Sequence, residues 1–193
     1  MSDFEKLRTC ILSCRQCQDL FGYEPQPVFQ GHAHSKIFQI SQAPSRSVHL
    51  THKPFNDASG TKLWGEWYQL TANDFYNPDY FYITAMANCF PGKAMGGGDK
   101  KPPKICSEMW LEKQLKMVDN EIYLIIGRYA ADYFFPKHRF DDLIFNDQVL
   151  RGKKAFVLPH PSPLNVKWFK DHPDFETGRM PVIRQRIHTV LGK

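Results

Sequence analysis

The sequence predicts an α/β fold with three layers, in which helices cover both faces of a central, mostly parallel sheet of four strands. The first observation is that apolar, β-forming runs alternate along the chain with segments whose apolar residues recur at helical spacing. The second is that a run such as residues 155–158 is apolar throughout and bounded by turn residues, which is typical of a buried strand. A chain of 193 residues is long enough for one such domain, so we expect a single domain over residues 1–193.

Each element is predicted from its own local pattern. Helices are predicted where apolar residues recur every three or four positions, as Phe4, Leu7 and Ile11 do, and strands where aromatic and β-branched residues cluster. Residues 93–104 are mostly lysine, glycine and proline and predict a mobile loop, and residues 137–151 carry no clear pattern. In chain order we expect a helix at 3–16, a strand at 37–40, a helix at 63–70, a strand at 80–85, a helix at 106–118, a strand at 121–126, a helix at 129–135, a strand at 155–158 and a last helix from about 181.

Composition limits the possible partners and the compartment. The formal net charge of +5 is compatible with a polyanionic partner such as DNA but does not require one. No apolar run is long enough to span a membrane, and the first residues carry acids in place of an apolar signal segment, so we expect a cytoplasmic protein. Nothing in the sequence indicates an obligate protein partner. In a reducing compartment, the five cysteines favour metal or catalytic roles over disulfides.

Four of the five cysteines form two groups with the spacing of metal ligands. Cys14 and Cys17 form a C-x-x-C pair, and Cys89 and Cys106 lie in a second region. Four thiolates would satisfy either a tetrahedral zinc ion or an iron-sulfur cluster, and the ligand type alone does not separate these two. The alternative is that Cys89 and Cys106 are buried small hydrophobic residues and that no metal is bound.

The residues that follow the last predicted strand are typical of a binding loop. His160 lies where the 155–158 strand ends, which is the edge at which α/β sheets place their ligands. Pro161 and Pro163 restrict the backbone, so His160, Ser162 and Leu164 would be presented by a stiff loop. The alternative interpretation is a surface turn with no function.

Together these segments resemble the iron-sulfur branch of the uracil-DNA glycosylase superfamily over nearly the whole chain. The branch combines a C-x-x-C pair, a strand exit rich in glycine, alanine and proline, a Pro-Phe turn, two further cysteines, a strand-Gly-helix unit and a His-Pro loop. The resemblance implies the fold of those enzymes, a [4Fe-4S] cluster on the four cysteines, and hydrolysis of the bond between deoxyribose and uracil, or another deaminated or damaged base, in base excision repair. The matching segments here are 14–17, 41–45, 54–55, 89–91, 106, 122–130 and 160–165.

The resemblance also implies roles for individual residues. His160 would donate a hydrogen bond to the base as negative charge develops on it, Phe55 would stack on the extruded base, and Leu164 would fill the space that the base leaves. We expect base contacts from Gln42, Ala43, Phe55, Ala85 and Asn88, and contacts with the DNA strand from Ser45, Arg46, Ser162, Pro163, Leu164 and Asn165.

Departures from the family pattern leave other functions open. Gln42 stands where the branch has glutamate, and the acidic pair of the branch falls on Val48 and His49, so no carboxylate is evident to orient water and His49 is our candidate for that role. The asparagine that reads uracil in the family falls on Ala85, which has no side-chain hydrogen bond to offer. The alternatives are a nucleic-acid-binding protein of the same fold with weak or no activity, and an iron-sulfur protein for redox sensing or transfer.

Overall fold

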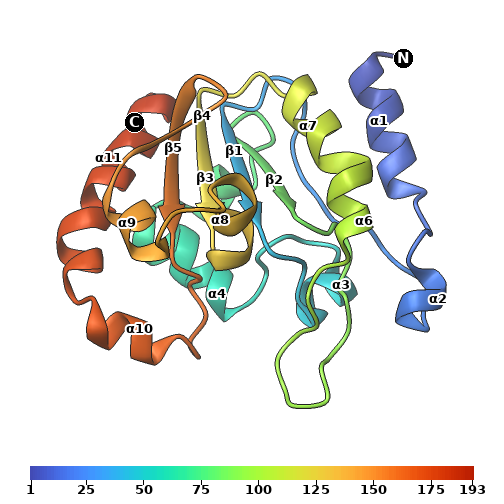
Figure 1. Cartoon of the computed structure of the whole chain (residues 1–193). Coiled ribbons are helices and arrows are strands. Elements are labelled where there is room, and N and C mark those ends of the chain that lie inside the picture. The colour runs from blue at the N-terminus through green and yellow to red at the C-terminus, as the bar shows by residue number, and fades with distance from the viewer.

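The computed structural model describes all 193 residues and is built around one five-stranded sheet (Figure 1). The spatial order of its strands is β2-β1-β3-β5-β4. The first four of these are mutually parallel, and β4 runs antiparallel to β5 at the edge. The strands are β1 (Ile37–Ser41), β2 (Phe81–Ala85), β3 (Ile122–Ile126), β4 (Gln148–Leu150) and β5 (Lys153–Leu158).

The predicted count of four strands is wrong by one, because a short edge strand lies in the segment for which no element was predicted. β4 and β5 are joined by Arg151 and Gly152, which both adopt positive φ angles of 51° and 77°. Two consecutive residues with positive φ are typical of the tight turns that join hairpin strands. β4 has three residues with no fully buried side chain, and its sequence therefore lacks the apolar pattern of the central strands.

Helices cover both faces of the sheet, as predicted, although several are shorter than expected or were not expected. The first helix ends at Leu12, four residues before the predicted boundary. Three helices contain a π-helical stretch and continue through it without a break: α4 into η1, α6 through η2 into α7, and η3 into α11. The helices are α1 (Asp3–Leu12), α2 (Gln18–Phe21), α3 (Arg46–Thr51), α4 (Ala58–Gly60), η1 (Thr61–Trp67), α5 (Ala72–Phe75), α6 (Lys104–Cys106), η2 (Ser107–Leu111), α7 (Glu112–Met117), α8 (Arg128–Phe134), α9 (Phe140–Phe145), α10 (Val166–Asp171), η3 (Phe175–Arg179) and α11 (Met180–Leu191).

Buried aromatic side chains fix which helices lie on which face. On one face, Tyr82 of β2 packs against Phe4 of α1, and its hydroxyl lies 3.0 Å from the Gln114 amide oxygen of α7. On the other face, the Tyr68 ring stacks on Phe81 of β2, with 6.1 Å between ring centroids. Both layers belong to one contiguous core of 36 buried hydrophobic residues.

The carboxyl ends of the parallel strands meet at the lower edge of the sheet in Figure 1, and the connecting loops there are long. β1 pairs with β2 on one side and with β3 on the other. The chain therefore reverses its direction across the sheet at β1, and α/β sheets form ligand crevices at such a reversal. No helix of the chain is long and apolar enough to cross a membrane.

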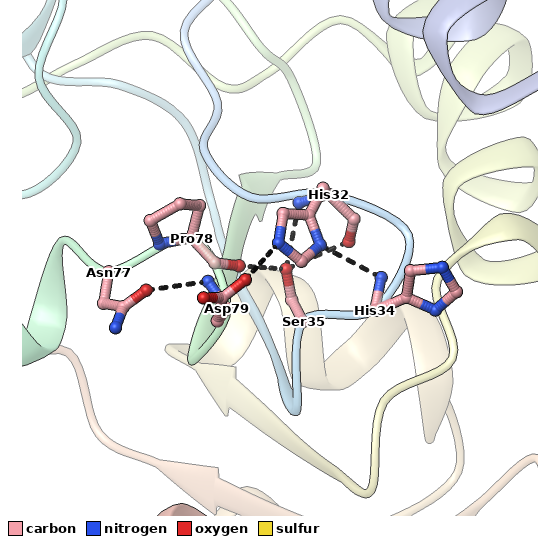
Figure 2. Close-up of polar contacts among 6 residues, drawn as sticks. All are labelled: His32, His34, Ser35, Asn77, Pro78 and Asp79. Carbon is pink, nitrogen blue, oxygen red and sulfur yellow. Dashed lines mark hydrogen bonds and ion pairs between the residues drawn. The ribbon is translucent and has the colours of Figure 1, made fainter. Parts of the chain in front are cut away.

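The opposite edge of the sheet carries a polar cluster that is structural (Figure 2). The His32 ring nitrogen Nε2 lies 2.6 Å from the Asp79 carboxylate, and its Nδ1 accepts a hydrogen bond from the backbone N–H of His34. The Ser35 hydroxyl lies 2.6 Å from the Pro78 carbonyl oxygen. These bonds join the loop before β1 to the turn before β2.

Candidate functional site

A cavity of about 400 Å³ lies at the carboxyl edge of the sheet, where the chain reverses direction at β1. Its walls come from the exits of β1, β2 and β5, from the turn that precedes α4, and from the loop between β2 and α6. The sequence placed only some of these segments in one site. The lining residues are Val28, Ser41, Gln42, Ala43, Pro44, Ser45, Val48, Pro54, Phe55, Asp57, Ser59, Ile83, Thr84, Ala85, Lys93, Gly98, Asp99, His160, Ser162 and Leu164.

The His160 ring lines this cavity in its neutral form, with an N–H group that is free to donate a hydrogen bond. Its Nδ1 accepts a hydrogen bond of 3.2 Å from the backbone N–H of Ser162, so the proton of the neutral ring lies on Nε2. Burial lowers the pKa of His160, and the nearby charges of Asp57 and Asp99 oppose that shift. The neutral ring can therefore donate one hydrogen bond from Nε2 to a group in the cavity.

Phe55 is held in a conformation that an aromatic residue rarely adopts. Its φ is +52°, and the Tyr76 hydroxyl bonds to the carbonyl oxygens of Pro54 and Phe55 at 3.0 and 3.2 Å. The Phe55 ring lines the cavity and also packs edge-on against Phe75. Strained backbone of this kind persists where the surroundings enforce it and is concentrated at functional sites.

The end of β2 forms part of the cavity wall. Asn88, which was expected to contact the base, is not part of that wall. Thr84 and Ala85 line the cavity, whereas Asn88 does not. The Asn88 side chain is buried and accepts a 2.9 Å hydrogen bond from the Thr84 hydroxyl. Asn88 is therefore placed to orient Thr84 and cannot replace the amide that Ala85 lacks.

The loop after β5 presents the residues expected to contact DNA. Leu164 is 90% exposed, and the Asn165 amide supports the loop through a bond to the His160 carbonyl. The Ser162 Oγ accepts a hydrogen bond from the Leu164 backbone N–H. The proton of that hydroxyl has no partner within the chain, which leaves it for a ligand. Pro163 lines a neighbouring groove with Lys62 and Lys170.

His49 lies outside the cavity, and the Ser45 hydroxyl already has partners within the chain. The His49 ring is absent from the cavity lining and packs between Tyr23 and Phe90, with ring centroids 5.4 and 6.1 Å away. Ser45 lines the cavity, but its hydroxyl donates to the Asp57 carboxylate at 2.9 Å and accepts from the Val48 backbone N–H. A hydroxyl has one proton, so Ser45 has none left for a phosphate. Arg46 is exposed at the first turn of α3.

Three charged lining residues were missed by sequence reasoning. Asp57 lies in the Pro-Phe turn, two residues after Phe55, and its carboxylate caps the amino end of α4. Lys93 and Asp99 come from the predicted mobile loop, which folds back on itself through a bridge between these two residues. Their side chains form an ion pair of 2.6 Å. An acidic residue close to Phe55 is the one signal that could have indicated a carboxylate in the site.

The four predicted metal ligands come together in a second, mostly apolar cavity. Cys14, Cys17, Cys89 and Cys106 all line it, whereas Cys10 is exposed and lies elsewhere. The other lining residues include no histidine and no acid, so the four cysteines are the only ionisable ligands that this cavity provides for a metal. The backbone N–H of Asn88 donates to the Cys106 sulfur at 3.3 Å. This donor set is suited to a zinc ion or an iron-sulfur cluster.

The thiols of this cavity are not drawn together into a coordination sphere. No group of three or more Cys, His, Asp or Glu side chains is arranged closely enough to hold a metal ion. Burial raises the pKa of Cys106 to about 11, and burial together with the neighbouring Cys106 thiol raises the pKa of Cys89. Both thiols are therefore neutral without a metal. A bound metal would lower their pKa values, because it stabilises the thiolate form.

Comparison with known proteins identifies relatives of this chain. The family model described as the uracil DNA glycosylase superfamily matches residues 28–183. A type-4 uracil-DNA glycosylase from Sulfurisphaera tokodaii is 24% identical over 140 residues, which cover 71% of this chain. The match spans 60% of the length of that relative.

Among solved structures, the solution NMR structure of a candidate uracil DNA glycosylase from Methanosarcina acetivorans is similar to this chain. The TM-score is 0.47 and the sequence identity 15%. The match covers 81% of this chain and 94% of the other.

Proposed function

This chain belongs to the uracil DNA glycosylase superfamily, and on that premise we propose that it is a DNA glycosylase of base excision repair. It would hydrolyse the N-glycosidic bond of uracil, or of another deaminated or damaged base. The observation that carries the proposal is one cavity that contains both an aromatic ring, Phe55, and a neutral histidine, His160, with an available Nε2–H. A glycosylase needs these two groups to stack an extruded base and to stabilise the charge it acquires.

The chemistry follows from the placement of His160. As the bond between C1′ and the base breaks, its electron pair remains on the base, and the carbonyl oxygen of the base becomes more negative. A hydrogen bond from Nε2–H strengthens as that charge grows, so it stabilises the transition state more than the bound substrate. Because the ring lies in a largely buried site, this hydrogen bond is worth more than it would be in water.

Contacts with the DNA strand are proposed for the loop after β5. The Leu164 side chain is almost fully exposed on this loop, and an apolar side chain there can enter the base stack and fill the space of an extruded base. Phosphate contacts are proposed for the free hydroxyl proton of Ser162, which lines the cavity, and for the exposed Arg46. A net charge of +5 adds a general attraction, which we expect to weaken as salt is added.

Cys14, Cys17, Cys89 and Cys106 are proposed to hold a [4Fe-4S] cluster. Their convergence in one apolar cavity supports this assignment, and the N–H bond from Asn88 to Cys106 is of the kind that stabilises a cluster sulfur ligand. When bound, the cluster would cross-link the segment between α1 and α2 to the exit of β2 and to α6. Its position outside the cavity of His160 supports a structural role. Visible absorbance of the purified protein distinguishes this cluster from colourless zinc.

Base release from defined oligonucleotides tests the proposed function. Purified protein is incubated with strands that carry a single uracil, hypoxanthine or xanthine, and alkali then cleaves at any abasic site. Cleavage at one of these bases is the expected result and identifies the substrate, which Ala85 leaves open because it offers no side-chain hydrogen bond. Protein that binds DNA and cleaves at none of the three would contradict the proposal and favour a non-catalytic binding protein.

A further inference from the structure

The cavity contains a carboxylate whose side chain is held rigidly. The Asp57 Oδ2 accepts a hydrogen bond of 2.9 Å from the Ser45 hydroxyl, and Oδ1 accepts one of 3.0 Å from the backbone N–H of Gly60. A carboxylate oxygen has two lone pairs, so each oxygen keeps one for another donor. The carboxylate therefore has a fixed orientation and can still accept a proton or a water molecule.

Asp57 differs from the other carboxylate of the cavity in its charge balance. Asp99 is paired with Lys93 at 2.6 Å, whereas both partners of Asp57 are neutral. An unbalanced negative charge opposes the binding of DNA, which is itself a polyanion. DNA binding alone would therefore not favour a carboxylate at this position, and its presence calls for a role in the reaction.

Capping of α4 accounts for only part of this arrangement. Asp57 is the N-cap residue of α4, which continues into η1, and the cap uses Oδ1 alone. Asparagine or serine would cap a helix about as well without placing a charge in the cavity. The bond from Ser45 serves the other oxygen and comes from the exit of β1, so two separate segments hold the carboxylate in place.

We propose that Asp57 is the catalytic base of this site and that Ser45 is its positioning residue. The inference rests on the proposed glycosylase function and deepens it, because no acid stands at positions 48 and 49. A water molecule from solvent attacks C1′ of the deoxyribose, and a new C–O bond forms there. The bond between C1′ and the base breaks, and its electron pair leaves with the base, which His160 stabilises. Asp57 takes the proton that the water loses.

The same carboxylate would also stabilise the sugar electrostatically. The deoxyribose becomes cationic as the base departs, and a nearby negative charge lowers the energy of that state. The two effects act on the rate of base release and not on the affinity for DNA. A catalytic Asp57 therefore has a signature that a purely structural residue lacks: its loss slows the reaction while DNA binding stays equal or becomes tighter.

Single-turnover base release by Asp57→Asn tests the assignment. The amide keeps the acceptor for Gly60 and removes the charge. We expect the rate on the substrate found for the wild type to fall by about a hundredfold or more, while affinity for an oligonucleotide with an abasic site is unchanged or higher. Asp57→Ser also keeps a capping residue, and added formate should restore part of its rate. Asp79→Asn, at the opposite edge of the sheet, is the matched control and should release base at the wild-type rate.

The possible outcomes separate this assignment from the proposed function. Wild-type protein that releases no base refutes the function and this inference with it. If the wild type is active and Asp57→Asn loses less than about tenfold, the function stands and Asp57 is not the base. A larger loss in Asp99→Asn than in Asp57→Asn also overturns the assignment, as does a rate loss that is matched by weaker DNA binding and is insensitive to formate.

Discussion

Replacing Gly60 by alanine should displace Phe55 and so change the shape of the cavity that the Phe55 ring lines. A Cβ atom at position 60 would lie 1.7 Å from the Phe55 carbonyl oxygen and 2.9 Å from the Phe55 Cβ. Non-bonded heavy atoms pack at about 3.5 Å, so the two segments must separate by more than about 1 Å. That movement also pulls the Phe55 carbonyl away from the Tyr76 hydroxyl, now at 3.2 Å.

The magnitude follows from these two effects. Overpacking of a tight site costs about 1 to 3 kcal/mol, and loss of a partly buried hydrogen bond adds about 1 kcal/mol. We therefore expect Gly60→Ala to lower the free energy of unfolding by about 3 kcal/mol, which for a chain of this size lowers the melting temperature by about 6 to 12 °C. Thermal unfolding followed by circular dichroism measures this shift. Base release at a temperature where the variant is folded should also be slower, because the Phe55 ring no longer faces the base.

Gly65→Ala is the matched control for this prediction. Gly65 lies in η1, in the same continuous helix as Gly60, and a Cβ there would meet no atom within 4 Å. Alanine at that position should leave stability unchanged or raise it by up to about 1 kcal/mol. If Gly60→Ala melts at the same temperature as Gly65→Ala and releases base at the wild-type rate, the proposed link between Gly60 and Phe55 is refuted.

Three further predictions concern the cysteines, the histidine and the exposed leucine. Cys89→Ser should abolish the visible absorbance of the cluster and lower the melting temperature, because metal binding contributes to folding. Cys10→Ser should retain the visible absorbance. A Cys89→Ser protein with full visible absorbance would exclude Cys89 as a cluster ligand. Burial depresses the pKa of His160 below its ordinary value of 6.5, so just below pH 6.5 the unfolded chain binds a proton that the native chain does not. Stability is therefore lost as pH falls through that window, and the loss measured by denaturant titration should be smaller in His160→Gln; equal losses would contradict the buried neutral ring. Leu164→Ala should change the free energy of unfolding by less than about 0.5 kcal/mol, because the Leu164 side chain is exposed. The same variant should slow base release from duplex DNA more than from single strands, because only a duplex has a base stack to fill. Equal slowing on both substrates would exclude this role of Leu164.

The central strands could be predicted from the sequence because burial on both faces leaves a continuous apolar run. Residues 122–126 and 155–158 show this run, and all of them are buried in β3 and β5 of the structure. β4 lacks such a run because an edge strand with exposed side chains has no need of it. Its hairpin turn also carries Arg151 at a positive φ, where asparagine, aspartate or glycine would have signalled a turn.

Residues within short recognisable motifs could be predicted to lie at one cavity, and residues whose position depends on tertiary contacts could not. His160 and Phe55 stand within short motifs, and both line the cavity. For Asp57 the sequence offers only its closeness to Phe55, because only folding brings the turn before α4 against Ser45 at the exit of β1. The position of His49 outside the cavity has the same origin, since only the fold packs its ring against Tyr23. Sequence spacing gives no information on which way such a side chain points.

The central claim is that His160 stabilises the departing base, and a single-turnover measurement on an oligonucleotide with one modified base tests it most directly. His32→Ala is the matched control, because His32 also lies beside a carboxylate but at the opposite edge of the sheet (Figure 2). We predict that the wild type and His32→Ala release base at equal rates, and that His160→Ala is slower by about a hundredfold or more, the effect expected for loss of one donor to a developing anion. Base release by His160→Ala at the wild-type rate, or no release by any of the three proteins, would contradict the account.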